Sequence, residues 1–338
     1  MPECTIMKSD NNHDDDDNHR TSFYLEVWGT DYSKLRDTCI LAEKLGYDGF
    51  LYGESLADID MDCWTVLSNL SALTNTIKLG PVITYLFPQY RNIVLLAKQA
   101  LTFQVISNGR LELRTGTGAT LQYATQWWYP YGIKYPNNAE RVSILEEGIQ
   151  LIHMLLWSSK NSRSSVHYTG KHFKINGGTV AFQKNPDFIK PIPVTIAAKK
   201  RRTMQIAAKY ADVWESSYIT PEQFASLNVE FEDAIMAGQQ QQSSNDDSSN
   251  EKKIVKSIEL DVIIADSDSD LEYKKRIFAM ERGPSVSYQI LKHGLVGKPD
   301  EIKERLKEYI AAGVDQFVLA FHDPFDSRAL ELFMDKSV

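Results

Sequence analysis

The sequence contains only three cysteines in 338 residues, no long apolar run and no excess of positive charge. Cys4, Cys39 and Cys63 are odd in number and form no C-x-x-C pair, so neither a disulfide framework nor a thiolate zinc site is expected. The chain has no run of about 18 apolar residues, so no membrane-spanning helix is expected. The formal net charge of −8 excludes a general phosphate-backbone binder, and we expect no nucleic acid partner.

Several catalytic motifs are also missing. The chain has no H-E-x-x-H, no Walker loop and no G-x-S-x-G elbow, which removes the usual support for metalloprotease, P-loop and serine hydrolase functions. Two acidic runs, Asp58–Asp62 and Asp266–Asp270, mimic the start of a calcium loop but lack its glycine and its closing glutamate. We interpret them as helix-start acids and solvated loop, and we predict no metal site.

Two segments are too polar to bury a core. Residues 1–21 include H-D-D-D-D-N-H, and residues 238–252 form a glutamine- and serine-rich stretch. We predict that the first is a disordered acidic tail and that the second is a low-complexity insertion in a surface connection. The acids Asp14–Asp17 stand where a signal peptide needs an apolar segment, so we expect a cytoplasmic protein.

Short apolar strands alternate with amphipathic helices between these segments. The predicted strands are 23–28, 48–52, 77–84, 110–115, 192–197, 212–216, 257–265 and 315–321. The first helix places Leu35, Cys39, Ala42 and Leu45 on one face, and the last does the same with Ile302, Leu306, Tyr309 and Ile310. Eight β-α units predict one TIM-type (β/α)8 barrel domain over residues 22–338, with a doubly wound open sheet as the alternative.

A local repeat strengthens this prediction. L-G-Y-D-G-F (45–50) and A-G-V-D-Q-F (312–317) each end a helix and open a strand, and Y-A-D-V-W (210–214) is a looser copy. A small residue or glycine turns the chain off the helix, and an apolar run follows at once.

One stretch breaks the alternation. Residues 158–191 have no helical period, and they predict a β-hairpin insertion before the fifth strand, with Gly177–Gly178 as the turn. Such insertions often shape the mouth of a barrel's active site.

Two short motifs follow predicted strands. Gly116-Thr117-Gly118 is not a dinucleotide loop, because Leu121 occupies the place of the third glycine, but its glycines allow a flat ligand to approach the backbone. Lys199–Arg202 joins the fifth strand to a helix N-terminus, which favours an anion or phosphate site. A solvated basic turn is the alternative.

Polar side chains end other strands, where a barrel faces its substrate. Glu54 and Ser55 end the second strand, Thr84 the third and His322 the eighth. Glu54 can serve as an acid or base, or as a helix-capping carboxylate, and His322 as a titrating group or a surface histidine. Tryptophans near the mouth, Trp28 and Trp127 among them, indicate a partly apolar substrate or ordinary loop packing.

Four segments carry a family resemblance through their sequences and their order along the chain. They are A-E-K-L-G-Y-D-G-F-L-Y-G-E-S-L (42–56), R-N-I-V-L-L-A-K-Q-A-L-T-F-Q-V-I-S-N-G-R-L-E-L-R-T-G-T-G (91–118), the predicted helix 139–157, and I-P-V-T-I-A-A-K-K-R-R-T-M-Q-I-A-A-K-Y-A-D-V-W (192–214). Together they resemble the bacterial luciferase-like superfamily of flavin- and deazaflavin-dependent enzymes, over roughly residues 22–325.

The resemblance implies a barrel with a hairpin insertion, assembled as a homodimer. It places Ile83 and Thr84 behind a cofactor ring, Gly116 and Gly118 near the ring edge or side chain, and Ala197, Ala198 and Lys199 at the phosphate. Many deazaflavin-using members end the second strand with Asp-His where this chain has Glu54-Ser55. That difference leaves Glu54 as the candidate acid or base, with His322 as a second catalytic candidate. Trp28, Ser55 and Trp127 are the candidate substrate contacts.

The resemblance therefore implies hydride transfer between coenzyme F-420 and a small organic substrate, with methylene-tetrahydropterin reductases as a possible subgroup. An FMN-dependent monooxygenase is the alternative enzyme. A barrel that binds a flavin without catalysis is the alternative of another class.

Overall fold

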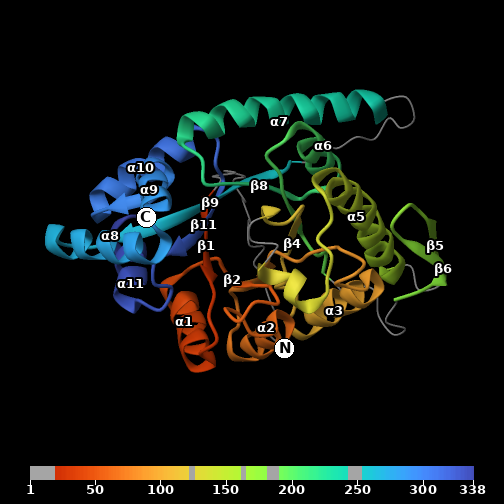
Figure 1. Ribbon diagram of the computed structural model, residues 1–338, viewed down its shortest axis with the longest axis horizontal. Helices are drawn as coiled ribbons and strands as arrows, with labels where there is room; N and C mark the ends of the chain where they lie inside the picture. The colour runs from red at the N-terminus through yellow and green to blue at the C-terminus, as the bar shows by residue number, and fades with distance from the viewer. Residues whose placement is uncertain (1–19, 122–125, 161–164, 181–189, 243–252) are drawn as a thin grey trace, which may run out of the picture.

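The structure is a computed structural model that describes residues 20–121, 126–160, 165–180, 190–242 and 253–338. Eight parallel strands form its frame (Figure 1). They are β1 (Ser22–Val27), β2 (Gly49–Gly53), β3 (Lys78–Val82), β4 (Leu113–Gly116), β7 (Val194–Ala197), β8 (Val213–Ser217), β9 (Val255–Ile264) and β11 (Gln316–Phe321). Hydrogen bonds join them in the order β3-β2-β1-β11-β9-β8-β7-β4. Parallel bridges Leu79–Leu111 and Thr84–Thr115 link the two ends. The predicted barrel is confirmed, and the open-sheet alternative is wrong.

Helices surround this barrel (Figure 1). They are α1 (Tyr32–Leu45), α2 (Cys63–Leu73), α3 (Ile93–Ile106), α5 (Asn138–Lys160), α6 (Arg201–Tyr210), α7 (Pro221–Gln242), α8 (Asp268–Arg282), α9 (Pro284–His293), α10 (Pro299–Ala311) and α11 (Ser327–Lys336), with a short 3-10 turn, η1 (Tyr129–Tyr131). The predicted stripe of α1 is buried at Leu35, Cys39 and Ala42. In α10 the prediction was wrong for Ile310, which is 43% exposed because it lies past the edge of the buried face.

No helix in the described ranges combines the length and the apolar composition that crossing a membrane requires.

The aspartates of the three repeat copies have a common structural role. The side chains of Asp48, Asp212 and Asp315 each accept a hydrogen bond, at 2.9 Å, from the backbone N–H of a residue that starts a neighbouring strand: Phe23, Val194 and Lys256 respectively. Each aspartate therefore joins two adjacent strands at the amino-terminal rim of the barrel. This rim is the side that stabilises a TIM barrel rather than the side that carries its chemistry.

The predicted hairpin is present, but its turn differs from the prediction. Strands β5 (Val166–Thr169) and β6 (Lys174–Gly178) are antiparallel, and the Gly170 N–H donates to the carbonyl of Phe173 at 2.9 Å, so the chain reverses there. Gly177 and Gly178 lie at the end of β6 instead. The hairpin packs against the outer side of α5, away from the barrel strands (Figure 1).

The two predicted polar segments fall partly outside the described residues. The tail was predicted over 1–21, and residues 1–19 lie outside the described ranges. The insertion was predicted from 238, but α7 continues to Gln242, because glutamine is a good helix former and prolongs the helix beyond Gly238. Residues 243–252 lie outside the described ranges. A short strand that the sequence did not reveal, β10 (Leu295–Gly297), pairs with β9.

A network of polar side chains fills the barrel interior beneath the carboxyl ends of the strands. Arg114 is fully buried and forms ion pairs with Glu215 and Glu112, and the Tyr24 hydroxyl donates to Glu112 at 2.5 Å. The Ser257 hydroxyl donates to Glu215 at 3.0 Å, so the network connects β1, β4, β8 and β9 across the interior. Because each buried charge is paired, this network can form a stable floor beneath the carboxyl ends of the strands.

The aspartate contacts at the amino-terminal rim are testable. Asp315→Ala removes the acceptor of the Lys256 N–H, and we expect a loss of about 1–2 kcal/mol in the free energy of unfolding, measured by urea denaturation. Asp315→Asn keeps an acceptor oxygen and should lose less. An Ala variant as stable as the wild type would contradict this role.

Candidate active site

Three neighbouring strands bring small and apolar residues together at the carboxyl rim. A Cβ atom placed on Gly116 of β4 would lie 3.1 Å from the Cβ of Ala197 and 3.1 Å from the Cδ1 of Ile83, which follows β3. The three residues therefore line one narrow surface, which we call the apolar slot. Any side chain at position 116 would press against Ile83 and Ala197, so only glycine leaves the backbone of β4 open to a close approach.

Thr84 and Gly118 flank the apolar slot. The Thr84 N–H donates to the Arg114 carbonyl at 2.8 Å, its side chain is fully buried, and its Oγ1 has no hydrogen-bond partner among the described residues. Gly118 adopts the left-handed region with a φ of +83°, and a Cβ there would lie 2.6 Å from the Tyr135 hydroxyl. Glycine is thus required at 118 both by conformation and by close packing.

A buried aromatic cluster fixes the loop that follows β4. Trp128 is fully buried and packs edge-on against Tyr85, with ring centroids 4.9 Å apart. The Arg141 guanidinium donates to the carbonyls of Thr117, Gly118 and Ala119 at 2.8–3.2 Å. Trp127, predicted to contact substrate, is half-buried and packs against the main core. Its neighbour Trp128 is the more deeply buried of the two and holds the loop against the core.

The predicted phosphate turn follows β7. The Ala198 N–H donates to the Glu215 carbonyl at 2.9 Å, and the Trp214 indole N–H donates to the Ala198 carbonyl at 2.8 Å. The backbone of Ala198 is therefore occupied by the sheet and offers no free donor. Partial burial lowers the pKa of Lys199, while the charge of Glu259 opposes this effect, so the ammonium group lies within electrostatic reach of the barrel mouth.

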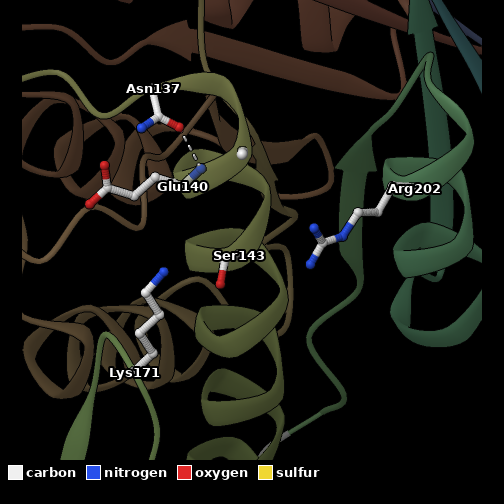
Figure 2. A pocket seen from close by; sticks show the side chains of 6 residues that line it. Asn137, Glu140, Ser143, Lys171 and Arg202 are labelled. Atoms are coloured by element: carbon white, nitrogen blue, oxygen red, sulfur yellow. Dashed lines mark hydrogen bonds between the residues drawn. The ribbon is translucent and has the colours of Figure 1, made fainter.

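A cleft of about 560 Å³ lies next to this turn, between α5, α6 and the hairpin turn. Figure 2 shows Arg202 extending from α6 toward α5, and Lys171 extending toward the same helix from the hairpin side. The backbone N–H of Glu140 donates to Asn137 at 3.0 Å at the start of α5, and Arg202 also pairs with Glu146 at 3.4 Å. The cleft thus carries two cations, with carboxylates at its edge.

Glu54 lies at the end of β2 in a buried ion pair. Its carboxylate binds the guanidinium of Arg91 and accepts a hydrogen bond from the Tyr90 hydroxyl at 3.2 Å. Burial lowers the pKa of Arg91 to about 10. These contacts suit a residue that positions Arg91 and Tyr90. The catalytic role of Glu54 stays a prediction. The neighbouring Ser55 hydroxyl donates to Asp60 at 2.9 Å and thereby organises the loop after β2.

His322 and Trp28 face other surroundings. The Nδ1 of His322 lies 3.6 Å from Glu281, and the ring packs edge-on against Phe278 of α8. It lines a separate cleft of about 270 Å³ beside α8, so the structure does not bring it to the apolar slot. Trp28, at the end of β1, is half-buried, and the guanidinium of Arg282 lies 5.6 Å from its ring centroid.

Two carboxyl groups that sequence reasoning missed lie inside the barrel. Burial and the charge of Glu259 raise the pKa of Glu26 in β1 well above its ordinary value. Burial and the charge of Glu215 raise the pKa of Glu259 in β9 to about 7, although the Tyr218 hydroxyl donates to Glu259. The Glu26 Oε2 atom is buried without a hydrogen-bond partner among the described residues. Proton-binding groups of this kind cluster at functional sites.

The sequence did contain a signal for these groups. Glu26, Glu259 and Asp261 stand at inward positions of strands whose other residues are mainly apolar. Side chains alternate between the two faces of a strand, so an acidic residue inside an apolar run must face either solvent or the barrel interior. In a strand covered by helices, only the interior remains.

The fold and this rim define a (β/α)8 barrel protein with a candidate site at the carboxyl ends of its strands. Residues 10–276 match the family model of luciferase-like monooxygenases. The chain therefore belongs to the luciferase-like monooxygenase family.

Individual relatives differ in activity. A 5,10-methylenetetrahydromethanopterin reductase from Archaeoglobus fulgidus is 28% identical over 181 residues, which cover 54% of this chain and 48% of that protein; the match thus spans about half of that relative. An F-420-dependent secondary alcohol dehydrogenase in complex with an F-420–acetone adduct has a TM-score of 0.75 at 15% identity, covering 94% of this chain and 98% of that chain. The oxygenating constituent of 3,6-diketocamphane monooxygenase from Pseudomonas putida, in complex with FMN, has a TM-score of 0.67 at 15% identity, with the same coverage.

The raised pKa of Glu259 predicts a pH-dependent stability. The folded protein binds this proton more tightly than the unfolded chain, whose carboxyl titrates near 4.5. Stability from this group is therefore present at low pH and is lost as the pH rises through about 7. Between about pH 5 and about pH 8, the wild type should lose stability relative to Glu259→Gln, which does not titrate.

Urea unfolding of both proteins across this range measures the difference, in which the titration of groups distant from Glu259 cancels and that of the neighbouring Glu26 is included. Parallel stability profiles for the two proteins would contradict the raised pKa.

Proposed function

We propose that this protein is an oxidoreductase that transfers a hydride between coenzyme F-420 and a small organic substrate. The observation that carries the proposal is the apolar slot of Ile83, Gly116 and Ala197, next to a basic turn on one side and facing carboxyl groups on the other. When bound, the deazaflavin ring supplies the carbon that gives or accepts the hydride.

The residues present fit such a cofactor. Gly116 has no side chain to separate a planar ring from the backbone, and Ile83 and Ala197 present apolar groups beside it. Lys199 and Lys200, at the start of α6, would hold the phosphate. The cations and the positive end of the helix dipole at the start of α6 favour an anion there. The protein's own contribution is to orient the ring, to exclude water with the aromatic cluster around Trp128, and to hold protons at Glu26 and Glu259.

The choice of F-420 over FMN rests on the cleft beside α5 and α6. Lys171 and Arg202 could bind the additional acidic tail of the deazaflavin, which FMN does not have. An FMN-dependent monooxygenase is the second candidate, because the 3,6-diketocamphane monooxygenase resembles this fold and was solved with FMN. Within the F-420 branch, a methylene-tetrahydropterin reductase is a specific possibility supported by the Archaeoglobus relative.

Thermal unfolding with each cofactor tests the proposal. A ligand specific for the folded state adds about 2.7 kcal/mol of stability at about a hundredfold excess over its Kd, so F-420 should raise the Tm more than FMN does. Gly116→Val should remove this shift by filling the slot. Gly238→Val is the matched control, because Gly238 lies on α7 with nothing within 4 Å of its added Cβ.

A larger shift with FMN would instead favour the monooxygenase. Turnover then separates an enzyme from a passive barrel, because binding without turnover of any donor would favour the passive barrel. No shift with either cofactor would contradict the proposal as a whole.

We also propose that the protein is a cytoplasmic homodimer. Exposed apolar side chains on neighbouring helices, namely Leu73 of α2 and Leu95, Val105 and Ile106 of α3, support a self-association surface. Sedimentation equilibrium should give twice the chain mass of 38.4 kDa, and a mass of one chain at micromolar concentration would contradict the dimer.

A further inference from the structure

Carboxyl groups line the barrel mouth opposite the apolar slot. Following the closed strand order, β9 lies four strands from β3, and β1 lies four strands from β7. Strands four apart face each other across an eight-stranded barrel. Glu259 and Asp261 of β9 therefore stand across the mouth from Ile83, and Glu26 of β1 stands across from Ala197. We call Glu26, Glu259 and Asp261 the acidic wall.

The members of the acidic wall are close enough to influence one another. Each of the other two carboxylates raises the pKa of Glu26, and Tyr218 donates a hydrogen bond to Glu259. Asp261 lies 3.7 Å from the Nε2 of His293, at the end of α9. The Glu26 Oε2 atom is buried and accepts no hydrogen bond from the described residues. This oxygen is an unused acceptor inside the mouth.

Within the described ranges, the cations near the acidic wall do not balance its charge. Arg114 lies beneath the wall and already forms ion pairs with Glu112 and Glu215. Lys199 is within the electrostatic range of Glu259, but it stands at the turn that we assign to the cofactor phosphate. A bound phosphate would compete for its charge. The mouth is therefore short of positive charge where a substrate would face the ring.

We propose that the acidic wall selects a substrate that carries a basic nitrogen and binds as a cation, an amine or an iminium ion, between the wall and the ring. This inference rests on the proposed function, because the ring forms the other side of the pocket. Beside a neutral or anionic substrate the buried carboxyl groups of the acidic wall stay protonated, whereas a cation next to them favours their ionised form. A cationic nitrogen supplies that positive charge and a hydrogen-bond donor for Glu26.

Calorimetric titration of the cofactor-loaded protein tests this selection with two probes of one shape. At neutral pH 2-methylpyrrolidine is a cation, whereas 2-methyltetrahydrofuran is neutral. We expect the cation to bind at least about tenfold more tightly, in line with a charge-assisted hydrogen bond. The double variant Glu26→Gln, Glu259→Gln should lose this preference. Glu230→Gln, an exposed position on α7, makes the same chemical change away from the site and should keep it.

Proton release provides a second readout that a purely structural role would not change. A bound cation favours the ionised carboxyl groups, so its binding near neutral pH should release protons in the wild type and none in the double variant. Titrations in two buffers of different ionisation enthalpy measure this number. The cofactor-induced Tm shift of each variant confirms that fold and ring binding are intact.

Equal affinity for the two probes, failure of the cation to bind at millimolar concentration, or a cation preference that survives in the double variant would overturn the inference. These results leave cofactor binding untouched. Loss of cofactor binding in the wild type would instead overturn the proposed function, so the two failures are distinguishable.

Discussion

The site depends on the buried guanidinium of Arg114. A charge with no solvent contact is stable only when opposite charges lie beside it, and Glu112 and Glu215 provide them from two sides of the barrel. Tyr24 and Ser257 extend the pairing to β1 and β9. These side chains form a continuous polar network inside the barrel, below the carboxyl groups at its mouth.

This polar network helps to explain why one side of the barrel mouth carries carboxyl groups and the other side is apolar. Burial and the neighbouring carboxylates raise the pKa of Glu26 and of Glu259, and Arg114, already paired below, offsets only part of this rise. On the other side, Gly116 packs closely against Ala197 and Ile83, so the surface there is apolar and formed partly by backbone. One wall can thus accept a flat apolar surface, while the opposite wall can hold protons or balance a positive charge.

Much of the fold could be predicted because local signals agreed with the global pattern. The aspartates of the repeat motif mark strand starts, and they do so because their carboxylates bind the neighbouring strand. The errors arose where packing decides the outcome. Ile310 continues a helical stripe but lies beyond the buried face, and the hairpin turns at Gly170 because Glu147 of α5 accepts the N–H groups of Lys171 and His172 there.

The candidate site was predicted less completely than the fold. The positions of Ile83, Thr84 and Gly116 follow from strand ends, which a sequence shows well. The surroundings of Glu54 and His322 do not, since Arg91 and α8 reach them from distant parts of the chain. Glu26 and Glu259 were missed although acidic residues within apolar strands of a helix-covered barrel indicate an inward direction.

A crystal structure of the protein with F-420 tests the central claim most directly. We predict that the ring contacts Ile83, Gly116 and Ala197, with its open face toward Glu26 and Glu259 and its phosphate at Lys199 and Lys200. A ring bound in the cleft beside His322, or one that lies against the carboxyl groups and leaves the Gly116 surface uncovered, would contradict it.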